Sequence, residues 1–186
     1  WEGLHPDLDL ADVRVYDAAG RTALTLPQVS VTVSWWTAVS GDLRLHALEI
    51  IGADLDIRRT RAGALLVGGI ELSQRDEGGT MSDWILGQRR IAISESKVRW
   101  NDEKRGAGEL ALANIRAVLE NSGSRHRFGF TADPPRHLAS RLDIRADLHG
   151  ESLSRLTQWR GTLYADLRYI DLAAWRSWIT RRCRSI

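Results

Sequence analysis

The sequence is poor in cysteine, lysine, net charge and long apolar runs, and each shortage excludes a class of protein. The single cysteine, Cys183, excludes an internal disulfide framework and a cysteine metal site. Lysine is scarce relative to arginine, and the formal net charge is only +2, because 26 Lys and Arg face 24 Asp and Glu. We see no basic stripe for nucleic acid in that balance. The apolar runs fall far short of the roughly 20 residues that a membrane-spanning helix needs.

Motifs for catalysis and for metal or cofactor binding are also lacking. The five histidines are scattered and have no metal-ligand spacing. Asp54 and Asp56 share one expected strand face and could act as a carboxylate pair in glycoside chemistry. Alternating acids are, however, expected on a solvated strand face without any catalytic role. Ser152 and Ser154 are not in a Gly-x-Ser-x-Gly elbow, and no phosphate loop or dinucleotide fingerprint is present. We therefore expect no enzyme, metal or cofactor, with hydrolase activity as the remaining alternative.

The sequence does have alternation of apolar and polar residues. It is clearest from Leu43 to Ile50 and from Asp54 to Arg58. A period of two is typical of a β-strand with one apolar face and one polar face. Gly52 separates the two runs where we expect a turn, and residues 60–63 interrupt the chain again before the next strand. The pattern predicts a mostly β, antiparallel meander with tight turns.

The same alternation, with local slips, extends through the chain. The first expected strand, Asp7 to Val15, changes phase near Asp12, and the second changes phase at Pro27, which predicts β-bulges. We expect about eleven strands and three short helices over 84–88, 151–158 and 170–180. Asp83 is expected to cap the first helix and residues 73–83 to form a mobile loop. Residues 35–41 are expected to form a short helical turn or an apolar connector.

Such a sheet has more apolar surface than its helices can cover. The apolar face of about eleven strands is on the order of 1,200 Å², whereas three short helices shield roughly 450 Å². We therefore expect the sheet to curl, as a closed sandwich or barrel with a dry core or as a trough filled by an apolar ligand. The residues expected on that face are Leu24, Leu26, Val29, Val31, Val33, Leu43, Leu45, Leu48, Ile50, Leu55, Ile57, Leu65, Val67, Ile91, Ile93, Val98, Trp100, Leu110, Leu112, Phe128, Phe130, Leu142, Ile144 and Leu148.

Several short stretches, in their order and spacing, carry a family resemblance over nearly the whole chain. The stretches are His5 to Leu10 with Val13 to Val15; Leu43 to Ile57 with Arg58 and Gly63; Trp84 to Leu86; Ile91 to Ile93; Val98 to Trp100; Asn121 to Gly123 with His126; Pro134 and Pro135; and Trp159 to Tyr164 with Trp175. In these stretches the chain resembles the AsmA-like family, and most closely its YhdP branch of bacterial envelope proteins. Residues 73–83 and the tail 181–186 carry none of the resemblance.

The resemblance implies a role in lipid transport. Related proteins are anchored in the inner membrane of Gram-negative bacteria and extend through the periplasm as a β-groove implicated in phospholipid delivery to the outer membrane and in outer-membrane homeostasis. Residues 1–186 would be a single segment of such a groove. Its partners would be phospholipid acyl chains, membranes through the parent protein, and neighbouring groove segments or envelope proteins, with no nucleic acid. The alternative is a structural or protein-binding envelope module with a closed dry core.

The ends of the sheet and the tryptophans are less constrained by the pattern. We expect the exposed edges to be the first strand, 7–15, and the last strand, 159–167, because a groove segment must continue into neighbours.

Trp35, Trp36, Trp175 and Trp178 lie in non-strand segments. They could cap the trough or meet a membrane interface, or they could fill a small core.

Overall fold

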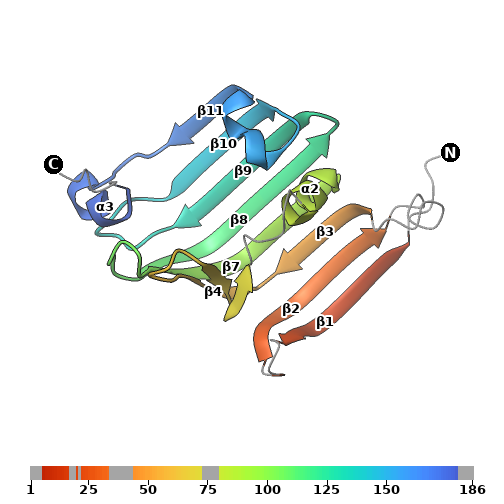
Figure 1. The fold of residues 1–186 in the computed structure, drawn as a ribbon, viewed down its shortest axis with the longest axis horizontal. Helices are drawn as coiled ribbons and strands as arrows, with labels where there is room; N and C mark the ends of the chain where they lie inside the picture. Colours follow the sequence, from red (N-terminus) through yellow and green to blue (C-terminus); the bar gives the residue numbers. More distant parts are fainter. Residues whose placement is uncertain (1–5, 17–19, 21, 34–43, 73–79, 180–186) are drawn as a thin grey trace.

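The chain forms one open, curled sheet in the computed structural model, which describes residues 6–16, 20, 22–33, 44–72 and 80–179 (Figure 1). The sheet has eleven strands, in the order β1-β2-β3-β7-β8-β9-β10-β11, with β4, β5 and β6 branching beside β7. The mostly β fold class and the number of strands are as predicted. The expected connector at 35–41 lies outside the described residues.

The elements have the following bounds. The strands are β1 Asp7–Tyr16, β2 Thr22–Val33, β3 Leu45–Ile51, β4 Asp54–Arg59, β5 Leu65–Val67, β6 Ile70–Leu72, β7 Arg90–Asp102, β8 Leu110–Ser122, β9 Arg125–Asp133, β10 Leu142–His149 and β11 Arg160–Asp166. The helices are α2 Thr80–Gly87, a 3₁₀ helix Leu153–Gln158 and α3 Leu172–Ile179.

The prediction of a hairpin turn at Gly52 is wrong. β3 and β4 run parallel to β7 with the same offset, since Leu48 pairs with Ile91 and Leu55 pairs with Val98. The two strands are therefore consecutive parts of one extended segment, and Gly52 (φ 76°) bends it. The sheet is mixed rather than purely antiparallel. Alternation reports which side chains share a face, but it carries no information about the direction of the neighbouring strand.

Backbone irregularities line up across five strand segments and form a crease, which we define by Asp12, Pro27, Gly52, Glu95 and Asn114. Asp12, Glu95 and Asn114 have positive φ values of 52°, 52° and 49°. The register of β7 with β8 shifts at this level. Each strand changes its side-chain phase here, so one face stays apolar on both sides of the crease. Bulges of this kind increase local twist and bend a sheet.

The phase change predicted near Asp12 and Pro27 occurs, but it is not a simple bulge. The pairs Ala11–Gln28 and Val13–Leu26 flank the site and have the same register, so the two strands slip together. The register shifts only at the far end of the pair, between Val15 and Tyr16. When both strands shift their apolar–polar alternation by one residue at the same point, their residues stay paired in the same register. The apolar residues of both strands then lie on the same face on either side of that point.

The helices are confirmed, although their bounds differ from those expected. α2 begins at Thr80, so residues 80–83 are helical and Asp83 lies within the helix rather than at the cap position expected for it. The rest of the expected loop, 73–79, lies outside the described residues. α3 begins at Leu172 rather than Ile170, because the Asp171 Oδ1 accepts hydrogen bonds from the amides of Ala173 and Ala174 at 2.9 and 3.0 Å and so forms the N-cap.

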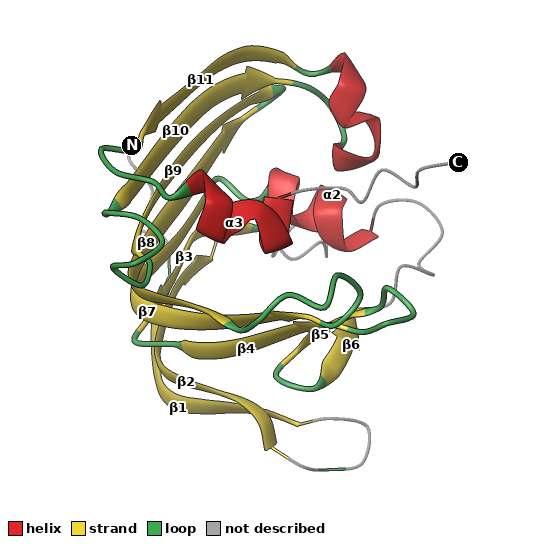
Figure 2. Ribbon diagram, turned by 90° about the vertical axis from the view of Figure 1, so that its left-hand side faces the viewer, coloured by secondary structure: helices red, strands yellow, loops and turns green. Residues whose placement is uncertain are grey.

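All three helices lie on the inner side of the curl (Figure 2). They leave a small buried core in the described part of the chain. Its apolar members include Ile115 and Ala132 at the crease, which are 4% and 0% exposed. The largest fully buried side chains are polar: Gln88, Asp102 and Ser96. A closed sandwich or barrel of this length would bury large apolar side chains instead.

Candidate functional site

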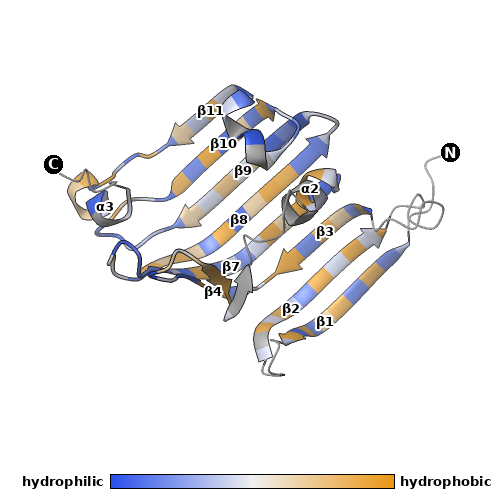
Figure 3. Ribbon diagram, viewed as in Figure 1, coloured by the Kyte–Doolittle hydropathy of each residue, from blue (hydrophilic) through white to orange (hydrophobic). Residues whose placement is uncertain are grey.

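The concave face of the sheet is apolar across strands that are far apart in sequence. Directly paired residues share a face, and the register connects Ile50 with Ile93 and Ile93 with Ala117. The same relation joins Ala117 to Phe130, and Phe130 to Ile144. The hydropathy colouring shows the resulting bands of apolar residues along the strands (Figure 3). The alternation in the sequence therefore predicted face membership correctly for most of this surface.

Most of the predicted face residues are only half-buried. Val29, Leu45, Leu110 and Leu142 are buried, and Phe128 is 37% exposed. Leu43 lies outside the described residues. Val33 pairs with Leu45 across a register shift. The amide of Leu45 donates a hydrogen bond to the side chain of Gln88, so both residues lie at the margin of the concave face. The half-buried residues are Leu24, Leu26, Val31, Val33, Leu48, Ile50, Leu55, Ile57, Leu65, Val67, Ile91, Ile93, Val98, Trp100, Leu112, Phe130, Ile144 and Leu148.

Further apolar residues, which were not predicted as part of the site, complete the same face. Leu119 pairs with Phe128, and Leu163 pairs with Ala146. Leu163, on the terminal strand β11, is 69% exposed, and Leu8, on the terminal strand β1, is 51% exposed. Their alternation is as regular as that of the predicted residues, so the sequence contained the signal. The apolar surface thus reaches both outer strands.

The sheet does not close on itself within the described part of the chain. β1 pairs with β2 alone and β11 with β10 alone, so both terminal strands leave one edge unpaired there, as predicted. The rival architecture of a closed dry core requires β1 to meet β11 or a second layer to cover the concave face. Neither arrangement is formed by the residues that the structure describes.

A polar network fixes α2 over one end of the concave face. The Asn121 Nδ2 donates to the carbonyl oxygens of Ile85 and Gln88 at 3.0 and 2.6 Å. The Asn121 Oδ1 lies 2.7 Å from the His126 Nδ1, and the His126 Nε2 lies 3.0 Å from the carbonyl oxygen of Gly150. The His126 ring stacks on Trp159 at a centroid distance of 4.9 Å. These contacts tie α2, β8, β9 and the Gly150 turn together and so position the helix.

Two tryptophans attach α3 at the opposite end. The Trp175 Nε1 donates to the carbonyl oxygen of Leu138 at 3.0 Å, and the Trp178 Nε1 donates to that of Gly108 at 3.1 Å. The two rings meet edge to face, 5.9 Å apart. α3 therefore joins the β7–β8 and β9–β10 connections. Trp35 and Trp36 lie outside the described residues.

The convex face carries the charged residues. Arg99 Nη1 lies 2.8 Å from an oxygen of Asp54, which is paired by its strand with β7. The hydrogen bond from Arg125 holds the pKa of Asp147 below its ordinary value, against an opposing effect of burial, and the charge of that guanidinium adds to the lowering. Arg145 lowers the pKa of Asp143 in the same way. Asp54 and Asp56 thus pair with a cation on the solvated face. No group of three possible metal ligands occurs in the part of the chain that the structure describes.

Family comparison agrees with this geometry. The model of the YhdP protein family matches residues 1–185. The chain belongs to the YhdP family. A search of curated proteins finds no match to it. Membership of the YhdP family is consistent with an envelope protein of the lipid-transport type. Across the described ranges, no helix has the length and apolar character needed to cross a bilayer.

Proposed function

We propose that this chain is one segment of a periplasmic hydrophobic groove that carries phospholipids between the inner and outer membranes, as part of an inner-membrane-anchored protein and without enzymatic activity. The observation that carries the proposal is the concave face: a continuous apolar surface whose side chains stay half-exposed beneath an open sheet. Each CH₂ group of an acyl chain buried there would contribute about 0.8 kcal/mol. Membership of the YhdP family supports an envelope lipid-transport role.

Residues 118 and 119 allow a matched test. Val118 and Leu119 are neighbours in β8, both apolar and both half-buried, but Leu119 pairs with Phe128 on the concave face and Val118 pairs with Gly129 on the convex face. A photoactivatable amino acid at position 119 should crosslink to phospholipid in cells, and the same group at position 118 should not. Mass spectrometry of the crosslinked product identifies the lipid.

Lipid extraction of the purified protein provides a second measurement. We expect co-purified phospholipid, with acyl chains held by the concave face. Protein that is lipid-free after purification and crosslinks equally at 118 and 119 would contradict the proposal. Crosslinks from 119 to envelope proteins alone, without lipid, would favour the protein-binding module instead.

A further inference from the structure

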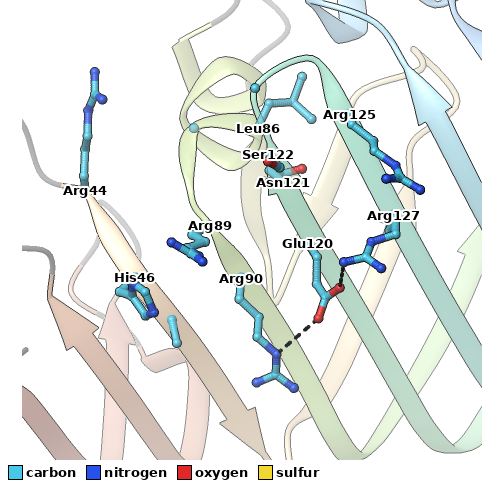
Figure 4. Close-up of a pocket in the computed structure, with 13 residues that line it drawn as sticks. Arg44, His46, Leu86, Arg89, Arg90, Glu120, Asn121, Ser122, Arg125 and Arg127 are labelled. Atoms are coloured by element: carbon cyan, nitrogen blue, oxygen red, sulfur yellow. Dashed lines mark ion pairs between the residues drawn. The ribbon is translucent and has the colours of Figure 1, made fainter. Parts of the chain in front are cut away.

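An arginine-lined cavity opens on the convex side of the sheet, outside the apolar face. It has a volume of about 760 Å³ and lies where β3, β7 and β9 begin and β8 ends (Figure 4). Arg90, Glu120 and Arg127 project to this face, because Arg90 pairs with Glu120 and Glu120 pairs with Arg127. Leu86 and Gly87 of α2 also contribute to the wall. The cavity, here called the arginine pocket, therefore extends to the rim between the two faces.

Positive charge dominates the arginine pocket. Five arginines line it, whereas Glu120 is the one acidic residue in its described wall. Asp147, at the edge, pairs with Arg125. The lining arginines are Arg44, Arg89, Arg90, Arg125 and Arg127. Among the described residues, the guanidinium groups of Arg89, Arg90, Arg125 and Arg127 are therefore accompanied by only two carboxylates, those of Glu120 and Asp147.

The ion pairs of Arg90 and Arg127 occupy only part of their hydrogen-bond donors. Arg90 Nε lies 4.0 Å from Oε1 of Glu120, and Arg127 Nη2 lies 3.1 Å from Oε2 of the same carboxylate. One carboxylate thus serves two guanidiniums, each of which has five N–H donors. Arg89 makes no side-chain ion pair with the described residues. In contrast, both oxygens of Asp147 bond to Arg125, at 2.9 and 2.5 Å.

We propose that the arginine pocket binds a phosphate group, carried either by a lipid headgroup or by a free phosphate. Guanidinium groups make paired hydrogen bonds to phosphate oxygens, and a phosphate offers enough oxygens to engage several arginines at once. The volume leaves room for a substituent on the phosphate. The site does not depend on acyl-chain binding, because the pocket lies at the strand ends and Arg90, Glu120 and Arg127 project to the convex side.

The test compares pocket variants with a matched surface arginine. Arg116 is an exposed arginine on the convex side of β8, outside the pocket wall, so Arg116→Gln removes one arginine charge elsewhere, half of what the double pocket variant removes. The double variant Arg89→Gln/Arg127→Gln should weaken inorganic phosphate binding by about tenfold or more, since charge-assisted hydrogen bonds are lost. Glu120→Gln should strengthen it, because a competing carboxylate is removed. Arginine Nε–H chemical shifts follow the titration, and circular dichroism checks folding.

Vesicle flotation separates the two sources of phosphate. Vesicles of phosphatidylcholine, with and without phosphatidylglycerol, are compared with inorganic phosphate. Saturable binding of inorganic phosphate that depends on the pocket assigns a free phosphate. Binding that requires phosphatidylglycerol vesicles and is lost in the double variant assigns a headgroup. The proposal is overturned if neither probe binds, or if Arg116→Gln weakens binding as much as the double variant does. Crosslinking from position 119 should persist in the double variant, which keeps this result separate from the proposed transport function.

Discussion

The two faces of the same strands differ in chemistry: the concave face is apolar and the convex face is charged. On the concave face, Phe130 and Ile144 pair across β9 and β10 and remain half-exposed to the interior of the curl. One residue further along β10, Arg145 bonds to Asp143 on the convex face. The charged side chains of the convex face are solvated by water. The apolar side chains of the concave face, in contrast, are not covered by a second layer of the described structure. An apolar surface of this extent that stays accessible is typical of a binding site rather than of a core.

This difference between the two faces indicates which residues stabilise the fold. Neither face buries much, so the strand pairing and a few buried positions must hold the sheet. These positions gather at the crease, where Ile115 and Ala132 lie, and at the strand ends, where Gln88, Asp102 and His126 are buried. The middle of the concave face is therefore available to a ligand at little cost to folding.

The largest expected effect tests whether the crease and the open face differ in this way. Ile115 and Ile144 belong to the same apolar face, but Ile115 is 4% exposed and Ile144 is half-buried. Ile115→Glu places an unpaired charge in a buried site and should cost about 3–5 kcal/mol. Ile144→Glu should cost about 1 kcal/mol. Urea unfolding measures both free energies.

Lipid content sharpens this first comparison. Ile144→Glu should lose co-purified phospholipid while keeping the sheet, because its carboxylate would face acyl chains. Equal destabilisation by the two glutamates would mean that the concave face is a covered core, and the groove function would then have no basis.

The second prediction contrasts a buried and an exposed carboxylate. Asp102 is 1% exposed, accepts a hydrogen bond from the amide of Arg105 at 3.1 Å, and lies 3.7 Å from Arg59. Asp102→Asn leaves these partners without the charge and should cost about 2–3 kcal/mol. Asp56, an exposed partner of Arg99, provides the control, and Asp56→Asn should cost less than about 0.5 kcal/mol. Similar midpoints in urea for both variants would contradict the assignment of stability to the strand ends.

The third prediction concerns the polar network at the α2 end. A Cβ atom on Gly150 would lie 2.3 Å from the Trp159 ring, which stacks on His126. Gly150→Ala should therefore displace the indole and cost about 1–3 kcal/mol through overpacking. Gly129→Ala is the control, since nothing lies within 4 Å of its added Cβ. The His126 ring resonances should move in the first variant and stay unchanged in the second.

The sequence predicted faces better than it predicted neighbours. Alternation placed Leu48, Ile93 and Ile144 on one side correctly, because face membership is a local property of a strand. It failed at Gly52, which looks like a hairpin glycine but bends one continuous segment beside β7. The choice of β7 as the partner depends on the crossover formed by residues 60–89, and no local pattern specifies such a pairing.

The arginine pocket was missed for a related reason. Overall charge is nearly balanced, so counting gave no sign of a basic site. The available signal was positional: Arg89 and Arg90 begin one strand, and Arg125 and Arg127 begin another. Only the register shows that these strand starts meet at the same end of the sheet. Likewise, the contact between Asn121 and α2 joins residues more than thirty positions apart.

The smallest expected effect is the response of the convex face to acid. In the folded protein Arg125 lowers the pKa of Asp147, so this pair contributes stability above the unfolded aspartate pKa of about 3.9 and loses it as the pH falls through the lower folded value. The contribution is small because both side chains are solvated. In phosphate-free buffer, Arg125→Gln should be slightly less stable than the unsubstituted protein at pH 7, and the difference should vanish well below pH 4. The carboxyl ¹³C shift of Asp147 should report a raised pKa in that variant, with Arg116→Gln as the control. A difference that persists or grows in acid would mean that Arg125 does not stabilise the fold through the ionised carboxylate of Asp147.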